Sequence, residues 1–425
     1  MAFRRAAFTL WLLATLSAGC NKKVTDAHFR LENGLRVDLL ATPKGDKAAL
    51  VLLFDVGADH DPAGRSGMAH LVEHLIATAG GPDRPARTIS QLEARYGHGF
   101  HAETGADFTL YAVEVPSERI IEELDDAALR MSRLAPTEND LAREKTRLFN
   151  EVATLQERDA TAAAMTRAAE SLHPSRGGGL RGGVAAELDK LTLDEVESFR
   201  RSHYGATTAR LVIAGHFDLQ DVLKRVRAEF DDAPTGKMPA ARAPAASRVT
   251  GTLVMNEAPT AVALAVPVPE PRDPTYPAFL VAASRVTAPG DTARTWKADF
   301  APLARPDILF VGGPLPKGQP AEPAAARLRA EISGIVGAPL AADEPARAVD
   351  TYGDALGMTA PSAKAIADAP FETAFAMGRR AQMGIDGAAL AQATRAVTAD
   401  QLAAAAKLFD ATHSTAVLTA AVKTR

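Results

Sequence analysis

The chain has almost no cysteine, because Cys20 is the only one among its 425 residues. A single thiol excludes a disulfide framework within the chain and leaves no thiolate for a zinc site elsewhere. An excess of one charge is also missing, since 48 Lys and Arg stand against 52 Asp and Glu without a basic run. Nothing in this balance favours nucleic acid as a partner. With 47% hydrophobic and 24% charged residues, the composition is that of a soluble globular protein with room for two or three domains.

The start of the chain is apolar but lacks the length of a membrane span. Two arginines precede the apolar stretch Ala6–Leu16, a pattern that is typical of an export signal. The segment ends in Leu16-Ser-Ala-Gly-Cys20, which resembles a bacterial lipobox. This resemblance implies a signal peptide over residues 1–20, a lipid anchor at Cys20, and an exported lipoprotein on the periplasmic face or the outer membrane. A signal peptide without lipid, carrying an incidental cysteine, is the alternative.

One short stretch carries the strongest chemical signal. Residues 68–76 read MAHLVEHLI and hold His70, Glu73 and His74 in the order H-x-x-E-H. On a helix, residues four apart lie about 40° apart around the axis, so both imidazoles share one face and Glu73 reaches the same patch. Two neutral imidazoles at this spacing can share one tetrahedral Zn²⁺, and a nearby unligated carboxylate can take a proton from water on the metal. The alternative is a surface helix that carries two solvated histidines and a glutamate.

The surroundings of this helix can also be predicted. Ser66 and Gly67 are typical of a helix start, and Gly80 is typical of its end. Upstream, Asn33-Gly34 predicts a tight turn between two strands, and Ala48–Val56 is apolar enough for a strand that is buried on both faces. The order of these elements predicts that the helix packs against a sheet.

A catalytic zinc needs a third protein ligand, and a second helix offers one. Thr137 and Asp140 form a capping-box-like pair that predicts the start of this helix. Glu144 and Glu151 follow seven residues apart, so both carboxylates fall on nearly the same face. The alternative is a pair of solvated acids beside neighbouring basic residues.

With these residues in place, the chain resembles the pitrilysin/insulysin family of H-x-x-E-H zinc metallopeptidases, in its bacterial two-domain type. The family is related to the subunits of mitochondrial processing peptidases. Its motif is followed at about this distance by a glutamate ligand, with an acidic accessory residue seven positions earlier. Carried over residue by residue, the resemblance implies that His70, His74 and Glu151 bind one Zn²⁺. It also implies that Glu73 is the general base and Glu144 the accessory catalytic acid.

Three further stretches resemble the family. Residues 33–37 resemble its first hairpin, residues 97–111 its substrate-pairing strand, and residues 191–230 the end of its first domain. The sequence predicts one strand from Gly97 to Val115. In the family, an edge strand here pairs with the backbone of a peptide substrate. The resemblance thus implies substrate contacts at His101 and Ala102, where the family usually has Asn-Ala. His101 therefore either donates to a substrate carbonyl, titrates near the metal, or is an exposed loop histidine.

The resemblance implies an α+β fold with two homologous halves. Each half would be an antiparallel or mixed sheet covered by helices, and the halves would face each other as a clamshell with the second half reduced. We predict a zinc peptidase domain over residues 21–235, a linker over 236–249, and a second domain without metal over 250–425. Within this second domain, residues 398–418 echo residues 192–213 as helix, loop and strand, which fits an internal repeat.

The second half keeps fewer of the family's features. It has no H-x-x-E-H, and where the family often carries an arginine and a tyrosine that hold the substrate, it offers Arg294 without a tyrosine. Two hypotheses follow. The first is a zinc endopeptidase that cleaves peptides or unfolded segments outside the cytoplasm. The second is a non-catalytic or partner-dependent subunit of a homo- or hetero-oligomer with a related chain. A lipid-anchored binding protein with an incidental motif is a third reading.

Overall fold

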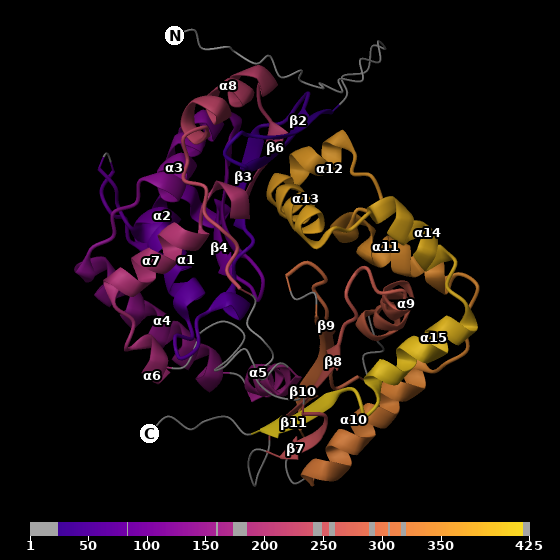
Figure 1. The fold of residues 1–425 in the computed structure, drawn as a ribbon. Coiled ribbons are helices and arrows are strands. Elements are labelled where there is room, and N and C mark those ends of the chain that lie inside the picture. Colours follow the sequence, from indigo (N-terminus) through magenta and orange to yellow (C-terminus); the bar gives the residue numbers. More distant parts are fainter. Residues whose placement is uncertain are drawn as a thin grey trace, which may run out of the picture.

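The computed structural model shows two β-sheets covered by helices, with the first half of the chain beside the second (Figure 1). This arrangement confirms the predicted α+β class. The predicted signal peptide with Cys20, and residues 241–248 of the predicted linker, lie outside the described residues. Among those described, no helix combines the length and the apolar character needed to cross a membrane. The structure describes residues 24–82, 84–158, 160–172, 185–240, 249–254, 260–288, 294–304, 307–315 and 320–419.

The sheet of the first half has six strands within the described residues, in the order β1-β2-β6-β3-β5-β4. Strand β2 pairs with β6 in parallel, and the other neighbours are antiparallel. β3 is central and buried along nearly its whole length, as its continuous apolar sequence predicts. β4 forms one edge of the sheet. The bounds are Thr25–Arg30 (β1), Arg36–Thr42 (β2), Lys47–Phe54 (β3), Phe100–Thr104 (β4), Thr109–Pro116 (β5) and Ala209–His216 (β6).

The predicted turn at Asn33-Gly34 is confirmed, and one strand prediction is wrong. Gly34 has a φ of 99°, which only glycine adopts without strain, and Asn33 donates to the carbonyl of Phe230 at 2.6 Å. The stretch from Gly97 to Val115 forms two antiparallel strands, β4 and β5, rather than one. They are joined by a turn over residues 105–108, in which the N–H of Gly105 donates to the carbonyl of Phe108 at 2.8 Å.

Among the described residues, the sheet of the second half repeats this pattern with one strand fewer. Within the described residues its order is β7-β11-β8-β10-β9, with β7 and β11 parallel and the other neighbours antiparallel. Over the part of the chain that is described, this sheet matches the first one except that it shows no counterpart of β1, as expected for a reduced second half. The bounds are Gly251–Val254 (β7), Ala261–Pro267 (β8), Lys297–Asp299 (β9), Ile308–Pro314 (β10) and Thr415–Thr419 (β11).

The helices lie on both faces of the sheets. In the first half, α1, α3 and α8 contribute to one large core with the inner residues of β3, β5 and β6. The helices of the first half are α1 (Met68–Thr78), α2 (Ile89–Tyr96), α3 (Ile120–Ser132), α4 (Glu138–Arg158), α5 (Ala160–Leu172), α6 (Ala185–Leu188), α7 (Leu193–His203) and α8 (Leu219–Phe230). Those of the second half are α9 (Tyr276–Thr287), α10 (Ala321–Val336), α11 (Glu344–Leu356), α12 (Ala363–Asp368), α13 (Pro370–Met383), α14 (Gly387–Arg395) and α15 (Ala399–Ala406).

The internal repeat predicted from the sequence is visible in both halves. Helix α7 leads into β6, and α15 leads into β11, each strand lying at the same place in its sheet. Both helices begin with a threonine capping box, formed by Thr192 with Glu195 and by Thr398 with Gln401. The domain boundaries at residues 235 and 250 stay a prediction.

One helix from each half packs on the sheet of the other half. Helix α13 lies on the face of the first sheet opposite α1 and α3, and α5 lies on the second sheet (Figure 1). On the first sheet, Leu53 and Phe108 share a buried cluster with Ala374 of α13. On the second, Leu172 of α5 packs with Phe310. Burying a large apolar side chain stabilises by about 1.5–3 kcal/mol, so the exchange joins the halves into one packed unit.

Candidate metal centre

Helix α1, which carries the H-x-x-E-H motif, is fully buried. All of its residues are buried, because an apolar helix can shed water only by packing against the sheet and neighbouring helices. Its N-terminus is capped by Asp61, whose carboxylate accepts from the N–H groups of Gly67 at 2.7 Å and Ala69 at 2.8 Å. Ser66 is not the cap, contrary to one reading of the sequence, and Gly67 takes the cap position with a φ of 88°. The sequence offered Asp61 only as an acid shortly before the helix.

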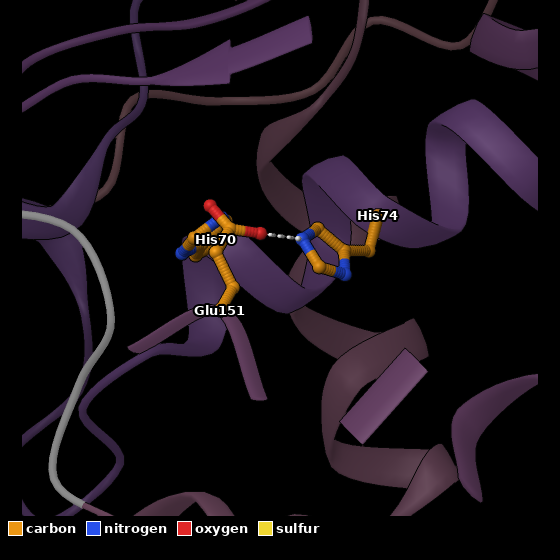
Figure 2. A group of neighbouring side chains, drawn as sticks. All are labelled: His70, His74 and Glu151. Atoms are coloured by element: carbon orange, nitrogen blue, oxygen red, sulfur yellow. Dashed lines mark ion pairs between the residues drawn. The ribbon is translucent and has the colours of Figure 1, made fainter. Parts of the chain in front are cut away.

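Three side chains converge on one point. His70 and His74 point from α1 toward Glu151 of α4, whose carboxylate faces the two rings (Figure 2). The carboxylate oxygens lie 3.9 Å from Nε2 of His70 and 3.6 Å from Nε2 of His74. All three donor atoms lie within 4.8 Å of one another, and no second group of this kind occurs among the described residues.

The donor set fits a zinc ion. Tetrahedral zinc with bonds of about 2.0–2.2 Å keeps its ligand atoms roughly 3.3–3.6 Å apart, close to the observed separations. The two imidazole rings are perpendicular, with centroids 4.8 Å apart, so both nitrogens can meet one ion without a clash. The side chain of Glu151 is 42% exposed, whereas those of His70 and His74 are 8% and 1% exposed. The site is therefore open on the side of Glu151.

Glu73 lies beside the donors without joining them. Its Oε2 is 3.6 Å from Nε2 of His70, and it accepts from the hydroxyl of Thr104 at 3.1 Å. Burial raises the pKa of Glu73 to about 7, against the opposing charge of His74 and the Thr104 hydrogen bond. Thr104 ends strand β4 and was missed in the sequence. The sequence feature that could have pointed to Thr104 is its position in the stretch that resembles the family's substrate-pairing strand.

Glu144 lies behind His74, on the side away from Glu151. Its Oε2 is 3.4 Å from Nδ1 of His74, and its Oε1 accepts from Thr78 at 2.9 Å. Arg143 and Arg147 add two charged hydrogen bonds to the same carboxylate, at 3.0 and 2.9 Å. Burial alone would raise the pKa of Glu144, but His74, Arg147 and Thr78 outweigh it and lower this pKa to about 2. An ionised carboxylate behind Nδ1 favours the tautomer whose Nε2 is free to bind a metal.

His101 and Ala102 lie in the middle of the edge strand β4. The ring of His101 stacks on Phe371 of α13, with centroids 4.0 Å apart and 11° between the planes. Burial lowers the pKa of His101. The reading of His101 as an exposed loop residue is therefore wrong, because it belongs to a strand and packs against the second half. Its contact with a substrate, and that of Ala102, stays a prediction.

Arg294 lies far along the chain from the metal centre and from β4, and it packs against residues of the second half. Its guanidinium lies over the ring of Trp296, 4.8 Å from the centroid, and it donates to the carbonyl of Ala288. Tyr352, the next tyrosine, is buried and bonds through its hydroxyl to Thr287 at 2.9 Å. These contacts give both residues a place in the packing of the second half.

Comparison with known proteins gives two family matches. Residues 36–174 match the family described as Insulinase (Peptidase family M16), and residues 190–289 match the Peptidase M16 inactive domain. The first match contains every residue of the metal centre, and the second straddles the junction of the two halves. Together they cover more than half of the chain.

Individual relatives agree with these matches. An uncharacterized zinc protease of Rickettsia bellii is 27% identical over 210 residues, which are 49% of this chain and 50% of the relative. The chain thus spans about half the length of the curated relatives it matches. Among solved structures, a protease from Helicobacter pylori has a TM-score of 0.75 at 18% identity, covering 94% of this chain and 100% of that one. A peptidase M16 inactive domain from Pseudomonas fluorescens has a TM-score of 0.73 at 15% identity, covering 94% and 99%.

Proposed function

Because the chain belongs to the insulinase family of peptidases, M16, we propose that it is a zinc-dependent endopeptidase that cleaves peptides or unfolded segments outside the cytoplasm. The observation that carries this proposal is the convergence of His70, His74 and Glu151, with the carboxylate of Glu73 beside them. A structural zinc site is usually closed by four protein ligands, whereas three ligands and an open side are typical of catalysis.

The geometry supports a distinct role for each residue of the centre. Zinc held by His70, His74 and Glu151 would supply Lewis-acid activation of the peptide carbonyl and of water. Glu73 would take the proton from the attacking water and deliver it to the leaving amine, because its carboxylate lies beside the donor atoms and is not one of them. Glu144 would act by holding His74 in its ligating orientation, so in this proposal it positions a ligand and touches no substrate.

The peptide would bind along strand β4. As the last strand of its sheet, β4 has one edge whose backbone groups are not paired within the sheet, and His101 and Ala102 lie at its centre. An extended peptide added to such an edge gains main-chain hydrogen bonds without regard to its sequence. Thr104 and Glu73 meet at the end of the same strand, so a peptide bound there would run toward the metal centre.

A second candidate function is that of a non-catalytic or partner-dependent subunit. It is favoured by the match of residues 190–289 to the M16 inactive domain and by the lack of a tyrosine beside Arg294. A side chain that binds the transition state contributes to rate even where the metal chemistry is intact. In this reading, a related chain would form an oligomer with this one and supply the missing contacts.

One experiment separates the two functions. The purified mature chain is assayed for zinc content and for cleavage of a quenched-fluorescence peptide, alone and with candidate related chains. We expect about one zinc per chain, slow cleavage by the chain alone, and a rise in kcat/KM of tenfold or more with a partner, or about 1.4 kcal/mol of transition-state binding. Fast cleavage by the pure chain would exclude the need for a partner. Zinc binding without cleavage in any pairing would favour the non-catalytic subunit.

We also propose that a lipid on Cys20 holds the mature chain at the cell envelope. Cys20→Ser removes the only thiol in the chain, so labelling with palmitate should be lost and the chain should move from the membrane fraction to the soluble fraction. Thr15→Ser, which lies before the lipobox-like segment, is the matched control and should leave both properties unchanged. Continued labelling of Cys20→Ser would exclude this residue as the lipid site.

A further inference from the structure

The turn between β4 and β5 is held by a buried arginine of the second half. Arg379 of α13 is fully buried and donates from Nη2 and Nη1 to the two carboxylate oxygens of Asp107 in the turn, at 3.0 and 3.3 Å. Its Nε donates to the carbonyl of Leu303 at 2.8 Å, and its guanidinium lies 4.1 Å from the centroid of the Phe108 ring. Bidentate pairing fixes both the position and the orientation of the carboxylate.

A second residue of α13 also binds this turn. Gln382 lies one helical turn after Arg379 and donates from Nε2 to the backbone carbonyl of Asp107 at 2.9 Å. Phe375 of the same helix packs near the ring of Phe108, with centroids 6.1 Å apart. The turn is therefore bound by its side chain, its backbone and its aromatic ring, and all three contacts come from α13.

The same turn is connected to Glu73, the proposed general base, through Thr104. Thr104 is the residue before the turn and pairs with Thr109 just after it. Its hydroxyl donates to Glu73 at 3.1 Å. A shift of the turn would move Thr104, and because Thr104 is the hydrogen-bond donor to Glu73 in the structure, the carboxylate would follow or lose its partner.

A second route runs from the turn to the start of helix α1. The N–H of Ala58 donates to the carbonyl of Gly105 at 3.0 Å, and the N–H of Asp59 donates to that of Ala106 at 2.8 Å. This loop continues to Asp61, the cap of α1. The contact leaves no room for a side chain at Gly57, because a Cβ there would lie 2.6 Å from the carbonyl oxygen of Gly105.

We propose that Arg379, aided by Gln382, is a positioning residue for the reaction, which holds Glu73 and the start of α1 in place through the 105–108 turn. The inference rests on the proposed function. It assigns the second half a role in the same chain as the metal centre, which it exerts through the turn. Preorganisation of this kind raises kcat, because a reacting group displaced by about 1 Å can cost up to 10²-fold in rate.

The test compares, in the full chain, the fully buried Arg379 with Arg285, whose side chain is 7% exposed. Arg379→Met removes the grip on the turn, whereas Arg285→Met removes an arginine whose bonds to Glu344 and to the carbonyls after α10 stay within the second half. We expect Arg379→Met to lower kcat about tenfold or more, with full zinc content and KM within about threefold of wild type. Arg285→Met should keep kcat within about twofold, at equal fractions of folded protein.

Hydrogen–deuterium exchange supplies a readout that needs no activity. In Arg379→Met, exchange should increase over residues 57–61, 68–78 and 100–108, while Arg285→Met should increase it around residues 335–347. If Arg379→Met fails to fold, Asp107→Asn tests the same contact, because it keeps the shape of the turn and leaves the bond from Arg379 to Leu303.

The double variant Asp107→Asn/Arg379→Met separates positioning from stability. Asp107→Asn alone leaves the fully buried guanidinium of Arg379 without its carboxylate, so stability should recover in the double variant relative to Asp107→Asn, while kcat should stay low. Three results would overturn the inference. The double variant could retain the kcat of the wild type, or Arg285→Met could lose as much kcat as Arg379→Met. The third is that exchange over residues 68–78 stays unchanged in Arg379→Met. If the wild-type chain cleaves no peptide, the proposed function fails, and the exchange measurement alone still decides whether Arg379 holds α1.

Discussion

Glu73→Gln is expected to abolish most peptide cleavage while the chain keeps its zinc and its fold. Glutamine has the same shape as glutamate and can still accept the hydrogen bond from Thr104, so the buried site loses no packing. It cannot take a proton from water, and general-base help of this kind contributes about 10²–10⁴-fold to the rate. The measurement is kcat/KM for a quenched-fluorescence peptide, with zinc determined by mass spectrometry on the same sample.

A second buried glutamate provides the control. Glu123 of α3 is likewise buried, and it accepts from Tyr96 at 2.8 Å and from Arg119 at 2.9 Å, in contacts that lie outside the metal centre. Glu123→Gln should therefore lower stability at most modestly and leave cleavage by the folded fraction unchanged. If Glu73→Gln retained activity within a few-fold of wild type, another group would have to move the proton, and Glu73 would not be the general base.

Loss of a metal ligand is expected to have the other large effect. Glu151→Ala and His74→Ala should each lose bound zinc, because two remaining donors hold the ion too weakly for a catalytic site. Glu151→Ala is the cleaner variant, since its side chain is 42% exposed and its removal opens no buried cavity. Cleavage should fall to background in both. Competition with a chelator of known affinity measures the loss.

A graded series makes this prediction sharper. Glu144→Gln keeps all three ligands and removes the negative charge behind His74, so zinc affinity should fall by about 10–100-fold rather than vanish. His413→Ala, which alters an exposed histidine bonded to Asp410, should leave zinc affinity unchanged. Full zinc binding by Glu151→Ala would show that the third ligand has been misassigned.

The local parts of this structure could be predicted from the sequence, because local rules determine them. The spacing in α1 puts His70 and His74 on one face, and the pair Thr137 and Asp140 starts α4 through the reciprocal bonds that the sequence indicates. The approach of Glu151 to both histidines needed more than spacing, since it depends on how two helices pack. The resemblance to a family supplied that step, and the geometry agrees with it.

Contacts between distant parts of the chain could not be predicted in this way. Arg379 meets Asp107 across 272 positions, and neither residue stands in a pattern that marks it. The cap of α1 could not be predicted because Asp61 reaches the helix from a loop, while Ser66 stands at the place that local rules favour. The single strand expected from Gly97 to Val115 is wrong for another reason, since the turn at residues 105–108 is bound by the distant loop at 57–59 and by α13.

The exchange of helices between the halves has a consequence for the order in which the chain can fold. The face of the first sheet that α13 covers stays open until residues 370–383 have been made, and the second sheet needs α5 from long before. The first half therefore cannot cover this face of its sheet while the chain emerges, and it presents Leu53 and Phe108 to water until α13 has been made. Contacts of such long sequence separation form slowly, so the unfinished chain exposes an apolar surface that is prone to aggregation until α13 has been made.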